Sequence, residues 1–515
     1  MKTTRNYRTI SELIWGRLSR LEWRFHSDVG QPTLDETDIS RQAPPMLSAR
    51  LYRGPARILC RTLVPVLLMM AGCVRFDPKP LNVARTADDF DARTLDTPSL
   101  RAFVETNLGP VSVWPPSQWS FEQLTFAALF LHPKLDVARA ELASVRAAEI
   151  TAGARPNPTV GVTPEYTVNP AGGASPWIAT VQFDLPIETA GKRGHRIAKA
   201  RQLSEAARLR LGDVAWQVRS GVRVALLDLH DAGHRAELLS NQLATHQRAL
   251  AAMETKFALG AATTAEIVPA RLALARLRKD IADARVLADE ARGRLAAAIG
   301  VPLKSLPPVA ALNPDTTTDA ALATAEARRR ALTSRADLLA ALAEYAASET
   351  ALRLEIAKQY PDVHLGTGYQ FDQGENKWAL GLTAEIPVLN RNQGPIAEAK
   401  AKRAEAAARV LALQARIIGD VDRALAVWQG AQSRLEAMKE LRTAQESRVK
   451  SLQAQLDAGA VESLDVLTAE RELTADELFQ WESRVQALRA FGELEDAIQF
   501  PLPPDLSLNA RRSEP

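Results

Sequence analysis

The chain has 515 residues, of which 46% are hydrophobic and only 5% aromatic, and its formal net charge is +3 at pH 7. Residues 1–72 hold five more Lys and Arg than Asp and Glu, so the rest of the chain is slightly acidic. The charge therefore gives no support for nucleic-acid binding, and the abundance of Ala, Leu, Glu and Arg favours long helices.

The first 72 residues predict an export leader. Arg57 and Arg61 precede an apolar run at residues 62–70, and small residues follow before Cys73. These features are typical of a secretory signal, and the run is shorter than the roughly 20 residues of a transmembrane helix. Met46 would begin a signal of conventional length, which makes it an alternative start of the chain.

Cys73 is predicted to carry a lipid anchor. Residues 70–73 resemble a bacterial lipobox, in which the cysteine is acylated and becomes the new N-terminus. Val74 follows, not the Asp that commonly retains lipoproteins in the inner membrane, so sorting to the outer membrane is implied. Cys60 would leave with the leader, so no disulfide pair remains and stability must come from packing or oligomerisation. The alternative is that Cys73 is an ordinary buried thiol.

The mature chain is predicted to be an internal duplication, because Trp177 aligns with Trp378 and Gly260 with Gly459. Each half has the order helix, two strands, very long helix, turn and helix. The expected segments are an N-terminal arm at 73–118, a first repeat at 119–300, a Pro-rich linker at 301–318, a second repeat at 319–500 and a C-terminal tail at 501–515.

Four segments are predicted to be strands, at 158–168, 177–187, 362–371 and 377–388. In each of them apolar residues alternate with polar or small ones, as in a strand with one apolar and one wet face. Their length suits a strand that crosses a membrane. Aromatic residues lie near one end of the strands, as at a membrane interface, namely Tyr166, Trp177, Tyr369 and Trp378.

These strands cannot form a closed sheet within one chain. Lipid offers no partner for unpaired backbone groups, so a spanning sheet must close. The smallest single-chain barrels have about eight strands, and a barrel of eight from two copies would be too narrow for a conduit. Three copies would provide a wider barrel of about twelve strands. The alternative is a soluble sheet packed on helices.

Two very long helices are predicted at 196–259 and 397–458, where the sequence contains no proline. At 1.5 Å per residue, each would reach about 95 Å. In the second helix an apolar seam from Val410 to Leu456 repeats at steps of three and four, as coiled-coil packing requires. Such a hairpin is unstable alone and would be stabilised by neighbouring helices in a tube. A generic soluble coiled coil is the alternative.

Two helix turns carry matching motifs. They read Gly260-Ala-Ala-Thr-Thr-Ala-Glu266-Ile-Val and Gly459-Ala-Val-Glu-Ser-Leu-Asp465-Val-Leu. With the order of elements, these motifs make residues 119–502 similar to the TolC-type outer-membrane factor family. The second copy is the closer match, because the first departs from the family pattern at Pro269.

A third motif points to a subgroup of that family. The turn Ile187-Glu-Thr-Ala-Gly-Lys-Arg-Gly194 resembles one found in CzcC-like heavy-metal channels. The second half has the family's plainer form at Leu389–Gly394. The resemblance implies a mixed, mainly α fold, in which a trimeric 12-strand transmembrane β-barrel continues into a periplasmic tunnel of long antiparallel coiled-coil helices.

The resemblance also implies a periplasmic gate at the helix turns. In the family, acidic residues after the second turn narrow the entrance. Asp465 stands at the first such position, Thr468 replaces the acid expected at the second, and Glu266 matches Asp465 in the first half. The alternative for Asp465 is an acid that interacts with a helix N-terminus.

The family's periplasmic adaptor docks at these tips, so the resemblance implies docking residues there. The candidates are Gly260, Thr263, Thr264, Gly459 and Ser463. For the hydroxyl residues, an ordinary capping role is the alternative.

No catalytic residue, metal site or cofactor is predicted. His230 and His234 stand at i and i+4 on a helix, a spacing that can bind zinc. Asp replaces the Glu of a metalloprotease motif and no third ligand is evident, so a surface pair is the better interpretation. No phosphate loop or nucleophile elbow appears.

The sequence therefore predicts a passive, trimeric outer-membrane conduit of an RND-type tripartite efflux pump. Its expected partners are a periplasmic adaptor, an inner-membrane proton-driven transporter and outer-membrane lipid, and it would extend into the periplasm of a Gram-negative cell. A type I secretion exit duct and a structural periplasmic coiled-coil lipoprotein are the alternatives. The sequence leaves the cargo open between heavy-metal cations and organic compounds.

Overall fold

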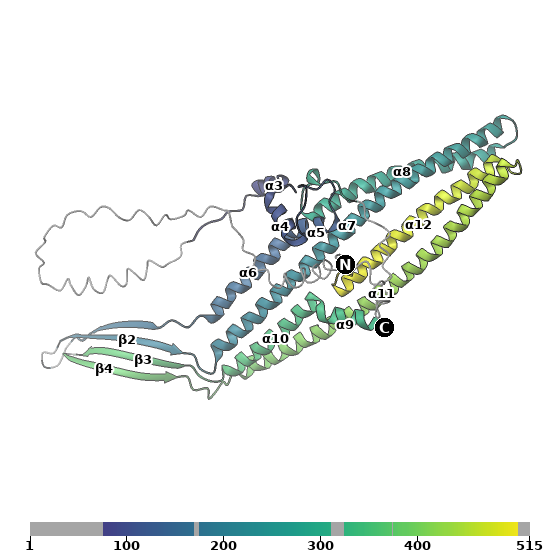
Figure 1. Ribbon diagram of the computed structural model, residues 1–515. Helices are drawn as coiled ribbons and strands as arrows, with labels where there is room; N and C mark the ends of the chain where they lie inside the picture. Colours follow the sequence, from purple (N-terminus) through teal and green to yellow (C-terminus); the bar gives the residue numbers. More distant parts are fainter. Residues whose placement is uncertain (1–75, 169–171, 173–174, 311–323, 373, 503–515) are drawn as a thin grey trace, which may run out of the picture. The chain divides into compact units, whose positions relative to one another are not determined.

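The computed structural model describes residues 76–168, 172, 175–310, 324–372 and 374–502 (Figure 1). The predictions for the leader and for Cys73, for linker residues 311–318 and for tail residues 503–515 fall outside these residues. The described residues belong to two compact units, 76–92 and 93–502. The first contributes helix α3 (Val83–Asp91), which begins where the Asn82 side chain accepts a hydrogen bond from the Arg85 N–H at 3.2 Å.

The second unit contains the order two helices, two strands, two helices twice, so the two halves are duplicates, and the first half has α4 and η2 in addition. The first series is α4 (Pro98–Leu108), α5 (Phe121–Leu131), α6 (Pro133–Gly153), β1 (Thr159–Tyr166), β2 (Trp177–Ile187), α7 (Lys192–Ala258), α8 (Thr264–Ile299) and the short η2 (Leu303–Ser305). The second is α9 (Thr324–Ser334), α10 (Ala336–Ala357), β3 (Val363–Asp372), β4 (Glu375–Ala384), α11 (Gln393–Asp457) and α12 (Ser463–Ile498).

The four strands form one antiparallel sheet in the order β1-β2-β3-β4. The fourth strand was predicted at 377–388, and this boundary is wrong, since β4 spans Glu375–Ala384. Gly374, at φ +103°, allows a tight turn from β3 that brings the start of β4 forward. The first residue of β3, Val363, pairs with Ala384, so residues beyond Ala384 have no opposite strand.

The sheet has one apolar and one polar face, because the pairing aligns the alternation of all four strands. Directly opposed residues of the apolar face include Val162, Val181 and Tyr369. The polar face is built from Thr, Gln, charged and Gly residues such as Gln182 and Gly368. Exposed apolar side chains cover the first face, among them Leu380 at 76% and Leu382 at 73%.

The long helices are longer than predicted, with 67 residues in α7 and 65 in α11. The helix α7 pairs with α8, α11 pairs with α12, and α7 and α12 lie side by side (Figure 1). At 1.5 Å per residue each long helix reaches about 100 Å. Within the described ranges, no helix combines the length and the apolar character needed to cross a membrane.

The hydrophobic core is concentrated in two clusters, one in each half. Leu100, Trp119 and Val222 are buried in the first cluster, and Val421 and Leu494 in the second. The middle of the predicted α11 seam is buried, namely at Ile417, Val421, Leu425, Trp428 and Leu435. Towards the hairpin tip the seam opens to solvent, and Leu441 is 42% exposed.

Candidate functional site

The α7–α8 and α11–α12 hairpins end in the same backbone turn. Gly260 and Gly459 both have φ +73°, in the left-handed region that glycine enters without steric cost. In the first turn the Ala261 N–H donates to the Lys256 carbonyl at 2.8 Å, and the equivalent bond in the second turn has the same length. A Cβ at either glycine would meet no atom within 4 Å. Backbone conformation, and not packing, therefore requires glycine here.

The two candidate gate acids lie at equivalent places after these turns, and both are exposed. The Glu266 carboxylate accepts hydrogen bonds from the Thr263 N–H at 2.7 Å and from the Thr263 hydroxyl at 3.1 Å. These bonds lower the pKa of Glu266. Asp465 Oδ2 accepts a hydrogen bond from the Glu462 N–H at 3.0 Å. Each acid therefore closes the first turn of its helix, as a reciprocal cap does.

The candidate docking residues Thr263, Thr264 and Ser463 are exposed at the hairpin tips. Thr263 occupies the N-cap of α8, whereas the N-cap of α12 is Glu462 and not Ser463. The capping alternative therefore suits Thr263 better than Ser463.

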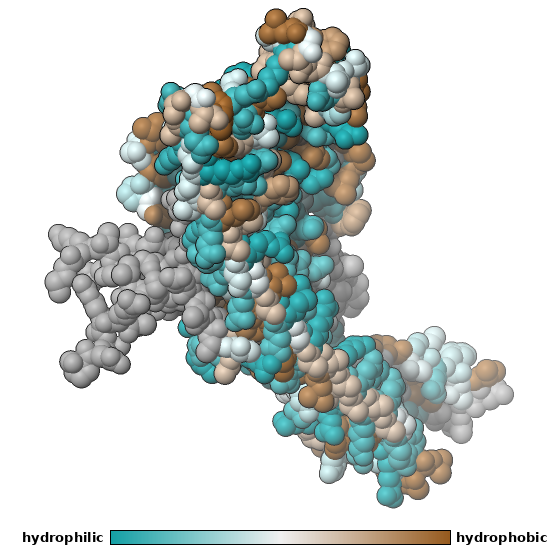
Figure 2. Space-filling view, turned by 90° about the vertical axis from the view of Figure 1, so that its right-hand side faces the viewer, coloured by the Kyte–Doolittle hydropathy of each residue, from teal (hydrophilic) through white to brown (hydrophobic). Residues whose placement is uncertain are grey.

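Apolar side chains are also exposed where α7 ends. Phe257 is 46% and Leu259 79% exposed. Figure 2 shows apolar residues among hydrophilic ones at the hairpin end. Only a contiguous apolar patch of several hundred Å² would by itself indicate an interaction surface.

Basic residues of α7 face acidic residues of α12 from the tips inward. Lys256 forms an ion pair with Glu462, and Arg248 lies 3.2 Å from Glu470. Further along, the distance between Arg235 Nη1 and Glu482 Oε1 is 3.0 Å. These contacts join the two hairpins of one chain. Their partners are far apart in sequence, so no local sequence pattern predicts them.

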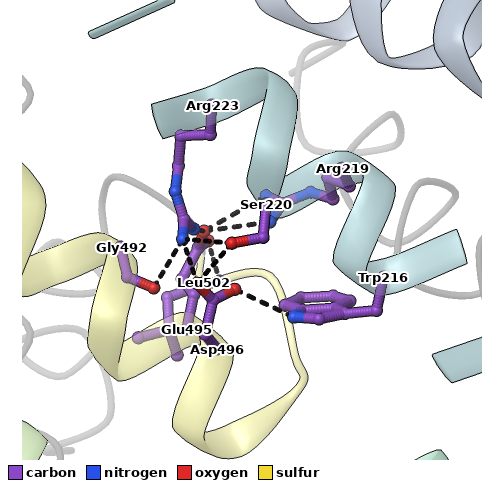
Figure 3. A network of polar contacts seen from close by, with 8 residues as sticks. All are labelled: Trp216, Arg219, Ser220, Arg223, Gly492, Glu495, Asp496 and Leu502. Atoms are coloured by element: carbon purple, nitrogen blue, oxygen red, sulfur yellow. Dashed lines mark hydrogen bonds and ion pairs between the residues drawn. The ribbon is translucent and has the colours of Figure 1, made fainter. Parts of the chain in front are cut away.

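A buried polar network fastens the middle part of α7 to the C-terminal end of α12 (Figure 3). Glu495, whose side chain is 5% exposed, accepts hydrogen bonds from Arg219 at 3.1 Å and Arg223 at 2.7 Å. Its other oxygen accepts from the Leu502 N–H at 2.8 Å. Both oxygens of the buried Glu495 carboxylate therefore have hydrogen-bond partners. A buried charge is tolerated under this condition.

The next residue extends this network. Asp496 accepts hydrogen bonds from Trp216 Nε1 at 2.9 Å, from the Ser220 hydroxyl at 2.5 Å and from Arg223 at 2.5 Å (Figure 3). Arg223 also donates to the Gly492 carbonyl at 2.8 Å. A Cβ at Gly492 would lie 2.7 Å from the Arg223 guanidinium. The Arg223 guanidinium can therefore occupy this place only because Gly492 has no side chain.

The Ile187–Gly194 turn anchors the sheet to the helices. Ala190 and Gly191 have φ 52° and 70°, which reverses the chain before α7. The buried Lys192 ammonium lies 2.8 Å from Asp362 Oδ1, which also accepts from the Thr189 N–H at 2.9 Å. Burial raises the pKa of Asp362, but hydrogen bonds from Lys192 and Thr189 outweigh it, and the net shift is downward. The turn thus holds an ionised carboxylate from the other repeat.

The four predicted interface aromatics form two cross-strand pairs on the apolar face. Tyr166 is directly opposite Trp177, with ring centroids 5.0 Å apart. Tyr369 is directly opposite Trp378, with centroids 4.9 Å apart. The sequence placed these residues near strand ends, and their pairing follows from the register. Their position at a membrane interface stays a prediction.

The two helical histidines have separate environments. His230 Nε2 lies 2.9 Å from the Ala310 carbonyl oxygen, and burial lowers the pKa of His230. His234 Nδ1 lies 3.2 Å from Glu237 Oε2, and its ring packs against Trp481 at 4.2 Å. Across the described residues, no group of three or more His, Cys, Asp or Glu side chains is arranged to hold a metal ion.

Known proteins resemble this chain over most of its length. At 25% identity over 368 residues, it matches the cobalt-zinc-cadmium resistance protein CzcC of Cupriavidus metallidurans, and the match covers 70% of this chain and 84% of that protein. Its fold is similar to that of CusC, with a TM-score of 0.62 at 19% identity, over 75% of this chain and 95% of CusC. It is also similar to the outer membrane protein VceC of Vibrio cholerae, with a TM-score of 0.59 at 19% identity, over 76% of this chain and 100% of VceC.

One protein-family pattern matches the chain twice, once in each half of the duplication. The sequence pattern of the family described as outer membrane efflux protein matches residues 126–301 and again residues 327–498. The two matches include the β-hairpin and both helices of the long hairpin in each half. The chain belongs to the outer membrane efflux protein family.

Proposed function

We propose that three copies of this outer-membrane efflux channel component assemble into one passive conduit. The supporting observation is the four-stranded sheet, which has an apolar face and two edges, at β1 and β4, that no other described strand pairs with. In lipid, unpaired backbone groups at those edges are too costly to persist. Three sheets joined edge to edge form a closed barrel of about twelve strands with the apolar face towards lipid.

The proposed conduit continues through the long helical hairpins towards the inner membrane. A helix of about 100 Å is long enough to carry the tunnel deep into the periplasm. An adaptor protein would bind the tips around Gly260, Thr264 and Ser463, and a proton-driven pump would supply the energy, since the chain itself catalyses no reaction. Cross-linking from Ser463 to a co-expressed adaptor would test this contact. The contact would be refuted if cross-links to the adaptor formed only from positions on the apolar face of the sheet.

The proposed cargo is a divalent transition-metal cation. Two observations support this class: the similarity to a cobalt-zinc-cadmium resistance protein, and the turn Ile187–Gly194, which resembles one found in CzcC-like heavy-metal channels. Deletion of the gene should then sensitise cells to cobalt, zinc or cadmium, and not to uncharged antibiotics. The reverse pattern of sensitivity would contradict the proposed cargo.

Single-channel recording provides the test of the conduit. The purified mature protein in planar bilayers is expected to give stepwise currents, and its mass in detergent should correspond to three chains. A structural coiled-coil lipoprotein, the alternative from a different class, would give no current. A monomer that is soluble without detergent would contradict the proposal.

For Asp465 we propose a second role beside capping, as one of three carboxylates around the periplasmic entrance. Such rings attract cations in pores. Asp465→Asn keeps an oxygen that can accept the Glu462 N–H bond and removes only the charge. We expect block by multivalent cations to weaken several-fold in Asp465→Asn. Glu266→Gln tests the second candidate gate acid in the same way. Equal block in wild type and Asp465→Asn would leave Asp465 only its capping role.

The N-terminus is proposed to be lipid-anchored through Cys73. The short apolar run and the lipobox-like ending support this role. Radioactive palmitate should label the wild-type protein and not Cys73→Ser. Equal labelling of the two proteins would show that another residue is acylated. If neither protein were labelled, the proposed lipid anchor would be refuted.

A further inference from the structure

The four helices that adjoin the sheet have two different surfaces. One end of each of α6, α7, α10 and α11 lies next to the sheet (Figure 1). The helix α6 packs on α7, and α10 packs on both α7 and α11. A groove runs along α10 between α7 and α11, and its lining includes Lys199, Ala351 and Glu398. The helices therefore have one surface towards this groove and one away from it.

The groove lies on the polar side of the sheet. Lys192 and Lys199 are seven positions apart in α7 and so share one face of that helix. The Lys192 ammonium lies 2.8 Å from the carboxylate of Asp362, which directly precedes Val363 of β3. Val363 is on the apolar face together with Tyr369, and successive residues of an extended chain point to opposite faces. The helix surface away from the groove is therefore on the apolar side of the sheet.

An exposed basic residue of each helix points away from the groove, and we call these four residues the basic girdle. They are Arg146 of α6, Arg201 of α7, Arg353 of α10 and Lys400 of α11. Successive residues of a helix are about 100° apart, so residues two positions apart point in nearly opposite directions. The girdle residues of α7, α10 and α11 each come two positions after a groove residue, namely Lys199, Ala351 and Glu398.

The girdle residue of α6 follows from the duplication. Pro158 aligns with Pro361, so Ala148 is the counterpart of Ala351, and Arg146 is two positions from Ala148. Counted from the helix end next to the sheet, the four girdle residues are between four and nine positions along their helices. This corresponds to about 6–14 Å. The girdle residues therefore lie at similar distances from the sheet.

The charges of the girdle are not neutralised within the described part of the chain. None of the four side chains forms a hydrogen bond or an ion pair with another described residue. Acids at helical spacing from them have other partners or none. Glu205 pairs with Arg208 at 2.6 Å, Glu349 accepts a hydrogen bond from the Tyr345 hydroxyl at 3.3 Å, and Glu149 forms no ion pair with a described residue. Four positive charges are therefore available to a partner.

Apolar side chains are exposed between the girdle and the sheet. Ile356 and Tyr360 come after Arg353 at the end of α10 and are 41% and 61% exposed. Ile150 follows Arg146 by one helical turn and is 79% exposed. Tyrosine, with an apolar ring and a polar hydroxyl, is typical of a membrane interface. The order of apolar sheet, apolar helix ends and basic girdle matches the order of hydrocarbon, interface and headgroups in a bilayer.

From these observations we propose that the basic girdle binds the phosphates of anionic phospholipids in the periplasmic leaflet of the outer membrane. Arginine and lysine form charge-assisted hydrogen bonds to phosphate, and basic residues next to a membrane-spanning segment attract anionic lipids. Such contacts would hold the barrel at a fixed depth. The position of the sheet in the membrane rests on the proposed function, whereas preference for an anionic headgroup can be measured in detergent.

Native mass spectrometry of the full-length protein in detergent tests the girdle. With phosphatidylglycerol and phosphatidylcholine supplied in equal amounts, wild type is expected to retain the anionic lipid at least about threefold more often. This preference should be lost when the girdle is neutralised by combining Arg146→Gln, Arg201→Gln, Arg353→Gln and Lys400→Gln. The same spectra give the mass of the assembly, so a variant that fails to assemble is recognised.

The matched control removes the same charge from α8. It combines Arg276→Gln, Arg278→Gln, Arg285→Gln and Arg292→Gln, at residues that are also exposed and also unpaired among the described residues. The control should keep the wild-type preference for phosphatidylglycerol. Equal loss in the girdle and α8 variants would overturn the proposal, as would equal retention of the two lipids by wild type.

A second measurement requires no variant. In phosphatidylcholine vesicles that contain the wild-type protein, a spin label on phosphatidylglycerol should show a larger immobilised fraction than the same label on phosphatidylcholine. Raising the ionic strength from about 0.1 M to about 1 M shortens the Debye length from about 10 Å to about 3 Å, so this difference should disappear. A difference that salt leaves unchanged would contradict binding through the girdle charges.

Single-channel currents report the conduit separately, because the girdle points away from the polar side of the sheet. Normal currents without lipid preference would refute only the girdle. Lipid preference without currents would refute only the conduit.

Discussion

Replacing Glu495 by alanine is expected to lower the free energy of unfolding by roughly 3–5 kcal/mol, since removing one partner of a buried ion pair leaves uncompensated charges. Arg219 and Arg223 both donate to this carboxylate, and only 11% and 16% of their side-chain surfaces are exposed. The Leu502 N–H would also lose its acceptor. The measurement is chemical unfolding of the detergent-solubilised protein, followed by circular dichroism of the helices.

An exposed acid two residues earlier provides the control for this experiment. Glu493 forms an ion pair with Arg423 at 3.2 Å, and the two side chains are 50% and 61% exposed. Exposed ion pairs contribute about 0–1 kcal/mol to stability. The free energy of unfolding of Glu493→Ala should therefore be close to that of wild type. Equal losses in Glu493→Ala and Glu495→Ala would show that the buried network does not fasten α7 to α12 as described.

Leu380→Arg is expected to prevent assembly in lipid. Leu380 lies in the middle of β4 on the apolar face, where it is 76% exposed. An arginine facing lipid near the bilayer midplane costs about 2–4 kcal/mol per chain, and the proposed assembly would contain three such chains. The expected result is loss of the three-chain mass in detergent and of channel currents after reconstitution.

The neighbouring residue on the same strand separates the two faces. Ala379 is paired with Gly368 on the polar face. Ala379→Arg therefore introduces the same side chain at nearly the same depth, but towards the proposed lumen. It should form trimers and reduce the current through each channel. If Ala379→Arg blocked assembly and Leu380→Arg did not, the assignment of the two faces would be reversed.

Local patterns in the sequence were sufficient to predict most of the architecture. Alternation of apolar and polar residues predicted the strands because the sheet has two distinct faces. The glycines at 260 and 459 predicted the hairpin tips because left-handed backbone is a local requirement. The end of β4 could not be predicted in this way. It depends on where the opposite strand begins, at Val363.

The charged contacts were beyond sequence reasoning for a related reason. Arg219 and Glu495 are 276 positions apart, and each resembles an ordinary surface charge on an amphipathic helix. Lys192 belongs to the motif Ile187–Gly194, but its partner Asp362 lies in the other repeat. Only the packing of the two halves against each other shows that these side chains meet.

The order β1-β2-β3-β4 also determines how the proposed ring could fail. Its free edges belong to unlike strands, so each copy would join its neighbour head to tail, and rotation alone could complete the circle. A copy with a damaged β1 edge could still capture one neighbour through β4 and leave the circle broken. Co-expression of such a copy with the intact protein would be dominant negative, because one defective chain is enough to break a ring. A minority of defective chains would therefore remove most of the working channels.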